Sequence, residues 1–328
     1  MSIQREPSGF TRLTTSSGAS MLVSTLGARI VELWVPDKQG TLGNVVVGMP
    51  AAEHYQERAN LYLGCTVGRV AGRIPGAHFQ GGGLSFSLEP NEGANQLHGG
   101  GEESFDRVEW ELVTFESADS VTAEFHYVSP AGQEEYPGEL TVISRYELTA
   151  ECVFTSTLMA ETTAACPVNL TTHSYWNLSG TPGTTIHDHV LIADLAWHVE
   201  TGEGQLPTGE LTPAAQELSL AASGWDDTFV LAEREHVTTP AATLTHPASG
   251  RTLQVYTTEP AIQIYTAGYL PEETFDEGHV LTPFGGVCLE PQRINDNPVF
   301  PQFPSIVLQP GDAYTHVTSH VFTASQGV

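Results

Sequence analysis

The sequence is almost without lysine and holds few cations of any kind. Lys38 is the single lysine, and 12 basic residues stand against 39 acidic ones, which gives a formal net charge of −27. A surface with this excess of negative charge repels nucleic acids and anionic membranes and disfavours anionic substrates. The charge therefore argues against nucleic-acid or membrane partners and favours a neutral small molecule or a protein.

Long apolar runs and paired cysteines are absent as well. No apolar stretch approaches the ~18 residues of a membrane-spanning helix, and the opening MSIQREPSGF has neither a basic start nor an apolar segment. We therefore expect no membrane span and no signal peptide, and a cytoplasmic location. The four cysteines lie far apart and form no CxxC pair, which is typical of buried thiols in a reducing compartment. They are Cys65, Cys152, Cys166 and Cys288.

Helical periodicity is scarce, whereas the alternation of half-buried strands recurs along the chain. In the segment 121–128, Val121, Ala123, Phe125 and Tyr127 fall on one face of an extended chain and polar residues fall on the other. Similar patterns occupy residues 141–148, 152–159 and 252–258. The 32 glycines and 21 prolines interrupt these strands at short intervals. Together the two features predict an all-β protein of antiparallel sheets.

Three local features refine this prediction. Residues 77–88 read as a β-hairpin whose turn is supplied by Gly81 to Gly83. Residues 51–58 and 213–222 could each form two or three helical turns. Because no linker, charge block or change of composition divides the chain, we expect a single domain over residues 1–328.

Polar residues that could carry chemistry gather in five loop-like stretches. The stretch 68–74 holds Arg69 and Arg73, 91–100 ends in His98 and two glycines, and 172–180 holds His173. The stretch 224–229 places Asp226 and Asp227 between Trp225 and Phe229, a combination that suits a sugar. In 288–305, Glu290 directly follows an apolar strand, where a carboxylate is costly unless it is paired or functional.

Each of these residues also has a plain structural interpretation. A histidine in a strand is usually a satisfied core or surface group, and an arginine is usually a salt-bridge partner. The pair His187 and His189 could bind a metal, but no third ligand stands at a suitable spacing, so packing is the better interpretation. The signatures GxSxG, HExxH, the P-loop and GxGxxG after a strand are all missing.

The residues alone thus indicate a β protein with a polar cleft of His, Glu, Asp and Arg. This set suits acid/base work on a neutral polyol, and equally a glycosidase or a sugar-binding module.

The motifs also resemble those of the aldose 1-epimerases (galactose mutarotases), in order and nearly from end to end. The matching segments are GRVAGRI at Gly68–Ile74, LHGG at Leu97–Gly100, NLTTHSYWNLSG at Asn169–Gly180, PTGE at Pro207–Glu210, DDTF at Asp226–Phe229, QIYT at Gln263–Thr266, and the late Glu290, Gln292, Phe303, Pro304 and Leu308–Tyr314.

The resemblance implies a β-supersandwich of large antiparallel sheets around an open cleft. It implies that Glu290 is the general base and His173 the general acid. The positions that match the family's sugar-binding residues are Arg73, His98, Asp226 and Gln263. No metal and no organic cofactor is implied. Apart from the resemblance, we expect the protein to act as a monomer or a homodimer.

The implied reaction is the interconversion of the α and β anomers of free hexoses or pentoses such as galactose or glucose. Glu290 removes the proton of the C1 hydroxyl while His173 protonates the ring oxygen, and after rotation about C1–C2 the roles reverse. The expected pH–rate profile is bell-shaped. The alternatives are a hexose-6-phosphate 1-epimerase, a non-catalytic sugar sensor of the same fold, and a glycosidase that uses Asp226 and Glu290.

Three departures from the family pattern bear on sugar preference. Gly72 stands where many members have asparagine, Asp227 replaces the histidine of the DHxF motif, and Asn295–Val299 reads NDNPV in place of PDAVN.

Overall fold

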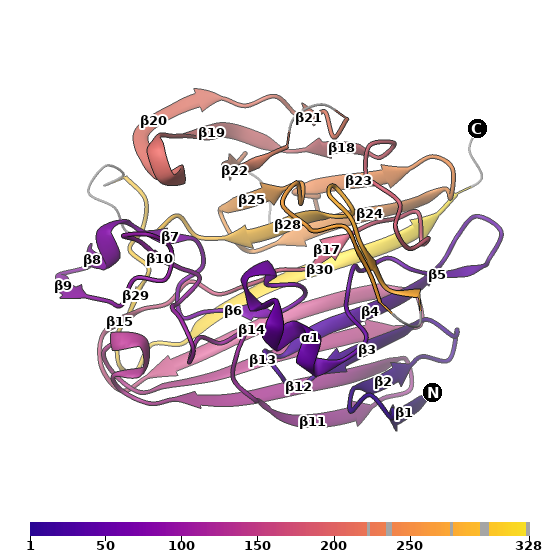
Figure 1. Ribbon diagram of the computed structural model, residues 1–328, viewed down its shortest axis with the longest axis horizontal. Coiled ribbons are helices and arrows are strands. Elements are labelled where there is room, and N and C mark those ends of the chain that lie inside the picture. Colours follow the sequence, from indigo (N-terminus) through magenta and orange to yellow (C-terminus); the bar gives the residue numbers. More distant parts are fainter. Residues whose placement is uncertain (222–223, 234–237, 276–277, 296–301, 326–328) are drawn as a thin grey trace.

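The computed structural model describes residues 1–221, 224–233, 238–275, 278–295 and 302–325, and these are mostly antiparallel strands (Figure 1). The all-β prediction is confirmed. The departures from the family pattern at 296–299 lie outside the described residues.

The largest sheet in the described part has nine strands. In spatial order these are β11 (Glu111–Glu116), β12 (Ser120–Ser129), β13 (Leu140–Thr149), β14 (Val153–Thr162), β30 (Tyr314–Ala324), β24 (Arg251–Thr257), β23 (Ala242–His246), β18 (Val190–Ala193) and β21 (Glu217–Leu218). The predicted alternation is clearest in β13, where buried and half-buried residues take turns after the first pair.

Two further sheets complete the architecture. The six-stranded sheet runs β17 (Tyr175–Trp176), β28 (Val287–Gln292), β25 (Ala261–Tyr265), β22 (Asp226–Leu231), β19 (Leu195–Thr201) and β20 (Pro207–Pro213). The five-stranded sheet runs β1 (Ser2–Arg5), β2 (Thr11–Thr14), β3 (Ser20–Ser24), β4 (Arg29–Pro36) and β5 (Leu42–Asn44).

The remaining elements are short. The two-stranded ladders pair β6 (Thr66–Val67) with β16 (Thr171–Thr172), β7 (Arg73–Ile74) with β10 (Gln96–Leu97), β8 (His78–Gly81) with β9 (Leu84–Ser87), β15 (Cys166–Pro167) with β29 (Val307–Leu308), and β26 (Glu273–Thr274) with β27 (Val280–Leu281). The helical segments are α1 (Ala52–Glu57) and the 3₁₀ turns Ala59–Leu61, Pro75–Ala77, Gln133–Glu135 and Glu203–Gln205. None of the described residues forms a helix long and apolar enough to cross a membrane.

The local predictions had mixed outcomes. The hairpin is confirmed: Gly82 and Gly83 form its turn with φ of +56° and +84°, two consecutive left-handed positions that favour glycine. The helix within 51–58 is confirmed as α1. The helix over 213–222 is wrong, because Pro213 ends β20 and Leu218 pairs with Leu191 as part of β21. Sheet pairing and the burial of Leu218 outweigh the helix propensity of the alanines.

The six-stranded sheet has two unlike faces, and this difference positions the candidate site. Side chains such as Phe229, Ile262, Ile264 and Leu289 are buried in the main hydrophobic core, shared with residues of the other two large sheets. Because strand residues alternate between faces, the residues between them point the other way. They form one polar surface across β22, β25 and β28.

Candidate active site

A cavity of about 430 Å³ opens over the polar face of the six-stranded sheet. This volume is within the ordinary range for sites that bind small molecules. All six residues that the resemblance assigned to the site line it: Arg73, His98, His173, Asp226, Gln263 and Glu290. They come from segments far apart in the sequence, so the fold brings them together.

The register of three neighbouring strands sets the cavity floor. Thr228, Gln263 and Glu290 are cross-strand partners in one row across β22, β25 and β28. Asp226, Tyr265 and Cys288 form the adjacent row, two residues away along each strand. Glu290 therefore lies within β28, not after the end of a strand as the sequence suggested, because β28 continues to Gln292. Pairing with Gln263 of β25 holds its backbone on one side, and β17 pairs with β28 two residues earlier, at Cys288.

His173 faces Glu290 and is held by backbone and ring contacts. Its backbone N–H donates to Cys65 O at 2.9 Å, and its carbonyl accepts from Gly64 N at 2.9 Å. Its imidazole lies between two tyrosine rings, with interplanar angles of 20° to both Tyr62 and Tyr175. These contacts leave the ring little freedom to turn, so its two nitrogens keep fixed directions.

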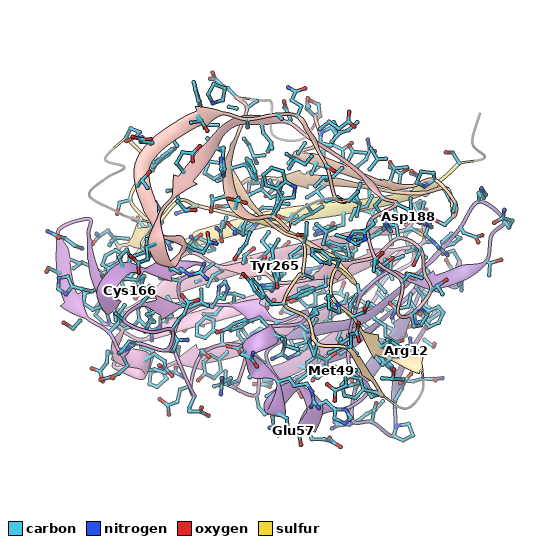
Figure 2. All side chains as sticks on the ribbon, turned by 45° about the horizontal axis from the view of Figure 1, so that its top comes forward. Arg12, Met49, Glu57, Cys166, Asp188 and Tyr265 are labelled. Atoms are coloured by element: carbon cyan, nitrogen blue, oxygen red, sulfur yellow. The ribbon has the colours of Figure 1, made fainter. Side chains whose placement is uncertain are left out.

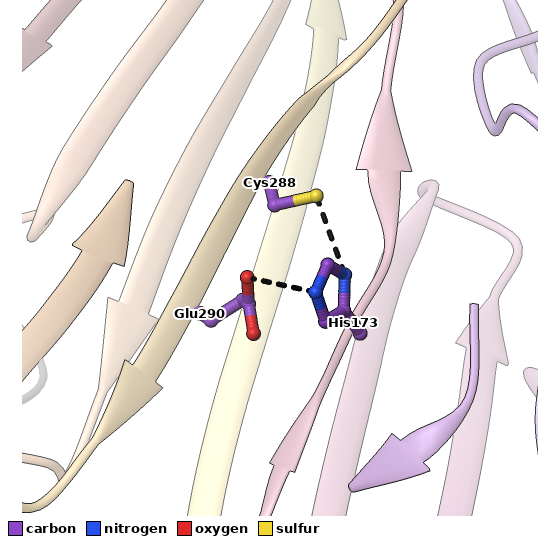
Figure 3. A group of neighbouring side chains, drawn as sticks. All are labelled: His173, Cys288 and Glu290. Carbon is purple, nitrogen blue, oxygen red and sulfur yellow. Dashed lines mark hydrogen bonds and ion pairs between the residues drawn. The ribbon is translucent and has the colours of Figure 1, made fainter. Parts of the chain in front are cut away.

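The two nitrogens of His173 face different neighbours (Figure 3). Nε2 lies 3.6 Å from Glu290 Oε1, and Nδ1 lies 3.4 Å from Cys288 Sγ. This trio is one of two groups of potential metal ligands in the described part of the chain. Because Cys288 and Glu290 do not converge on the same imidazole nitrogen, the arrangement suits hydrogen bonding better than chelation.

Burial drives both members of this pair toward their neutral forms. Burial raises the pKa of Glu290 well above its ordinary value, and the negative charge of Asp226 raises it further. Burial lowers the pKa of His173 to about 3. Among the described residues, none donates a hydrogen bond within 3.5 Å to the Glu290 carboxylate, although Glu290 is only 2% exposed. A buried carboxyl without a hydrogen-bond donor is unusual in proteins, which indicates that a bound ligand supplies the donor.

His98 and Arg73 form one wall through the pairing of β7 with β10, in which Leu97 lies opposite Arg73. His98 Nδ1 accepts from the backbone N–H of Gly72 at 3.2 Å, so its N–H is on Nε2. Burial lowers the pKa of His98 well below its ordinary value, which keeps it neutral. Gly99 is required here, because a Cβ on it would lie 1.9 Å from Gly68 O.

Asp226 and Gln263 form a hydrogen-bonded chain on the opposite side. Thr228 Oγ1 donates to Gln263 Oε1, and Gln263 Nε2 donates to Asp226 Oδ1 at 2.8 Å. The chain fixes the orientation of the Gln263 amide. Burial raises the pKa of Asp226, and the positive charge of Arg73 counteracts this. The cavity thus offers both donors and acceptors around Glu290, as a polyol requires.

Sequence reasoning missed the aromatic walls of the cavity. Tyr62, Tyr175 and Tyr265 line it, whereas Trp225 and Phe229, which seemed suited to a sugar, do not. Phe229 is only 2% exposed and belongs to the core. The alternation of strand residues could have found Tyr175, since it stands two positions after His173. No local signal points to Tyr62.

Two other sequence candidates lie outside the cavity. Arg69 is buried and donates to backbone carbonyls that include Pro137 O and Gly138 O, so its role is structural. Asp227 points away from the cavity and lies 3.0 Å from His198 Nε2. Its departure from the family pattern therefore does not alter the cavity lining, whereas Gly72 is part of that lining.

The HDH segment contributes Asp188 and His189 to a separate, satisfied cluster with His246, whereas His187 is exposed and its ring lies 5.1 Å from that of Phe284. Asp188 lies 3.0 Å from His189 Nδ1 and 3.0 Å from His246 Nε2. The other nitrogen of each imidazole accepts a backbone N–H, from Leu178 at 2.9 Å and from Ser249 at 3.2 Å. Both N–H groups therefore point at Asp188, which leaves no free lone pair for a metal. This cluster is structural, as the sequence interpretation favoured.

The chain is similar to one protein family, and to several of its relatives, over most of its length. The family model described as Aldose 1-epimerase matches residues 11–320. Galactose mutarotase from Homo sapiens is 34% identical, with 91% of this chain and 90% of the relative covered. Aldose 1-epimerase from Escherichia coli (strain K12) is 29% identical, with 95% of each covered. A solved aldose epimerase homologue from C. elegans superimposes with a TM-score of 0.86 at 24% identity, covering 97% of this chain and 99% of its own.

Proposed function

The chain belongs to the aldose 1-epimerase family, and on that premise we propose that its cavity interconverts the α and β anomers of free aldoses through Glu290 and His173. The observation that carries the proposal is the carboxyl of Glu290, buried without a hydrogen-bond donor among the described residues and facing His173 Nε2 at 3.6 Å. A site that only bound sugar would not need such a pair.

Ring opening requires a base at the C1 hydroxyl of the sugar and an acid at its ring oxygen. In the proposed mechanism Glu290 takes the proton of the C1 hydroxyl and His173 Nε2 gives a proton to the ring oxygen. The open-chain aldehyde then rotates about C1–C2, and the reverse transfers close the ring with the hydroxyl on the other side. Protons lost by one group are gained by the other, so the cycle regenerates both.

Burial raises the pKa of Glu290 and lowers that of His173, so it favours the arrangement in which Glu290 carries the proton and His173 is neutral. The reactive form, Glu290 ionised and His173 protonated, differs only by transfer of that proton across the 3.6 Å gap. Both arrangements hold the same number of protons, so the ratio between them does not depend on pH, and both are present over the same pH range. Sugar hydroxyls that donate to Glu290 would stabilise its ionised form, which favours the reactive arrangement on binding.

The other four residues are proposed to bind the sugar. Arg73 and His98 offer N–H donors from one wall, and Asp226 and Gln263 offer mainly acceptors from the other. The tyrosine rings beside His173 are suited to the apolar face of a pyranose. These positions do not single out galactose, glucose, arabinose or xylose, which share the C1–O5 unit.

We also propose the domain organisation, the location, the partner and the assembly of the protein. A single domain over residues 1–328 is supported by a family match that spans 11–320. A cytoplasmic location is supported by four buried free thiols. A neutral sugar as partner is supported by the net charge of −27. Action without a cofactor follows from the acid/base mechanism that the family resemblance implies, and assembly as a monomer or a homodimer stays an expectation.

Polarimetry of freshly dissolved α-galactose and α-glucose tests the function. The wild-type protein is expected to speed the approach to the equilibrium rotation, and Glu290→Gln at equal concentration is expected to abolish this. The control variant is Glu102→Gln, which removes a carboxylate that is 90% exposed and pairs with Arg107 at the surface. Sugar binding without any acceleration by the wild type would show that the cavity binds and does not catalyse.

A further inference from the structure

Arg73 enters the cavity already paired with a carboxylate that the family assignment does not include. Its Nε donates to Glu92 Oε2 at 2.7 Å and its Nη2 donates to Glu92 Oε1 at 2.8 Å. This is the bidentate geometry that makes arginine–carboxylate pairs strong and directional. The Arg73 side chain is 20% exposed and that of Glu92 is 37% exposed, and both residues line the cavity.

The pairing changes what Arg73 can offer a ligand. Two of its three nitrogens point at Glu92, and in the described part of the chain Nη1 donates to no residue. Glu92 balances the positive charge of Arg73, while the two N–H groups of Arg73 Nη1 remain available as hydrogen-bond donors. Such a group suits a neutral hydroxyl, whereas an unpaired guanidinium suits a phosphate or carboxylate.

The other arginine of the cavity also lies near a carboxylate, through a single ion-pair contact and not a bidentate pair. Arg293 Nε lies 3.5 Å from Glu259 Oε2, and its guanidinium lies over the ring of Tyr314 at 4.9 Å. Among the described lining residues, Arg73 and Arg293 are the only lysine or arginine side chains, and Glu92, Asp226 and Glu290 are the carboxylic acids. An anionic ligand would meet no uncompensated cation here.

We propose that Glu92 is a specificity-determining residue: by pairing with Arg73 it restricts the cavity to uncharged aldoses and excludes those that carry a phosphate or carboxylate. This inference rests on the proposed function, since it concerns the substrate class of the same cavity. Glu92 acts through Arg73, so it is a positioning residue and takes no part in proton transfer.

The test compares Glu92→Gln with the wild type, using D-galactose 6-phosphate as the probe. Its binding is followed by ³¹P NMR titration, which requires no catalysis, so an inactive wild type would refute the proposed function and leave this test intact. Glu92→Gln is expected to bind the probe about ten-fold more tightly, with a gain that falls as salt is added. For galactose, KM should rise while kcat stays near the wild-type value, because Arg73 loses its fixed orientation before and during the reaction alike.

Three variants make the test specific. Glu102→Gln changes the net charge by the same amount at the surface and should give no gain. Glu92→Asp keeps the charge and should also give no gain. The double variant Glu92→Gln with Arg73→Gln should lose the gain. The proposal is overturned if folded Glu92→Gln binds the probe no better than the wild type, if Glu102→Gln matches it, or if the gain persists without Arg73.

Discussion

Two clusters in this protein contain the same kinds of side chain and differ in how well their polar atoms are satisfied. In one, Asp188 accepts N–H groups from His189 and His246, and both imidazoles accept a backbone N–H on their other side. In the other, Glu290 faces His173 with no hydrogen-bond donor within reach in the described structure. Figure 2 labels Asp188 and Tyr265, which mark the two regions at separate places in the molecule.

The difference teaches that residue type alone does not locate a site. Asp188 is accessible to water, and its two histidines complete their hydrogen bonds within the protein, so the cluster stabilises the fold. Glu290 is buried, and its hydrogen bonds must come from something that enters the cavity. Glu290 lines the cavity, so a hydroxyl of a bound ligand can supply the donor that the described residues do not. Substitutions in the two clusters should therefore affect different quantities.

The largest expected effect is on the rate, from His173→Gln. We expect kcat/KM for mutarotation to fall by about 10²–10⁴-fold, because the variant cannot deliver a proton to the ring oxygen. The thermal midpoint should change little, because the backbone hydrogen bonds of residue 173 to Gly64 and Cys65 remain. Polarimetry and calorimetry measure the two quantities.

The matched control for this variant is His126→Gln, which alters a histidine on β12 whose side chain is 37% exposed. It should leave both rate and midpoint unchanged. A rate for His173→Gln that equals the wild-type rate would remove the acid role from His173.

The second prediction concerns stability, from Asp188→Ala. The N–H groups of His189 and His246 would lose their acceptor, and the His189 side chain is 0% exposed, so water cannot easily replace it. The free energy of unfolding should fall by about 1–3 kcal/mol, while the mutarotation rate at 25 °C stays unchanged. Denaturant titration with Asp312→Ala, an exposed aspartate, as control tests this. A lost rate in a fully folded Asp188→Ala would show that the cluster is not purely structural.

The third prediction reverses the sign of the stability effect at the catalytic pair. Because the folded-state pKa of Glu290 lies above its ordinary value of 4.5, ionisation costs stability as pH rises from that value through the folded-state pKa. Glu290→Gln removes this cost, so it should be more stable than the wild type by about 1 kcal/mol at high pH. The advantage should vanish below about pH 4, where Glu290 is protonated in both states. Unfolding curves of both proteins at several pH values measure it, and a pH-independent difference would contradict the assignment of the pKa shift.

Sequence patterns foresaw the sheets and the six site residues to different degrees. Alternation predicted strands such as β13 because one face of each is buried, and the family resemblance supplied the site residues. The aromatic walls were not foreseen. Tyr62 directly follows the 3₁₀ turn Ala59–Leu61, where no periodic pattern marks it, and it approaches His173 only through the tertiary fold. The pairing of Arg73 with Glu92 was likewise hidden, since it joins the first residue of β7 to a residue in the loop before β10.

The smallest expected effect is a shift of the pH–rate profile in Asp226→Asn. The profile should be bell-shaped: its acid limb reflects a second proton on the pair, near the His173 pKa of about 3, and its alkaline limb reflects loss of the shared proton. Asp226 raises the pKa of Glu290 through its negative charge, so Asp226→Asn should move the alkaline limb to lower pH.

The direction of that shift does not depend on which member of the pair carries the proton, because removing a nearby negative charge weakens proton binding by both Glu290 and His173. Asp227→Asn is the matched control: it makes the same change of charge one residue along β22, on the face that pairs with His198. It should shift the limb less. Equal shifts in the two variants would mean that the limb responds to the general charge of the protein, and the alkaline limb could then not be assigned to the pair.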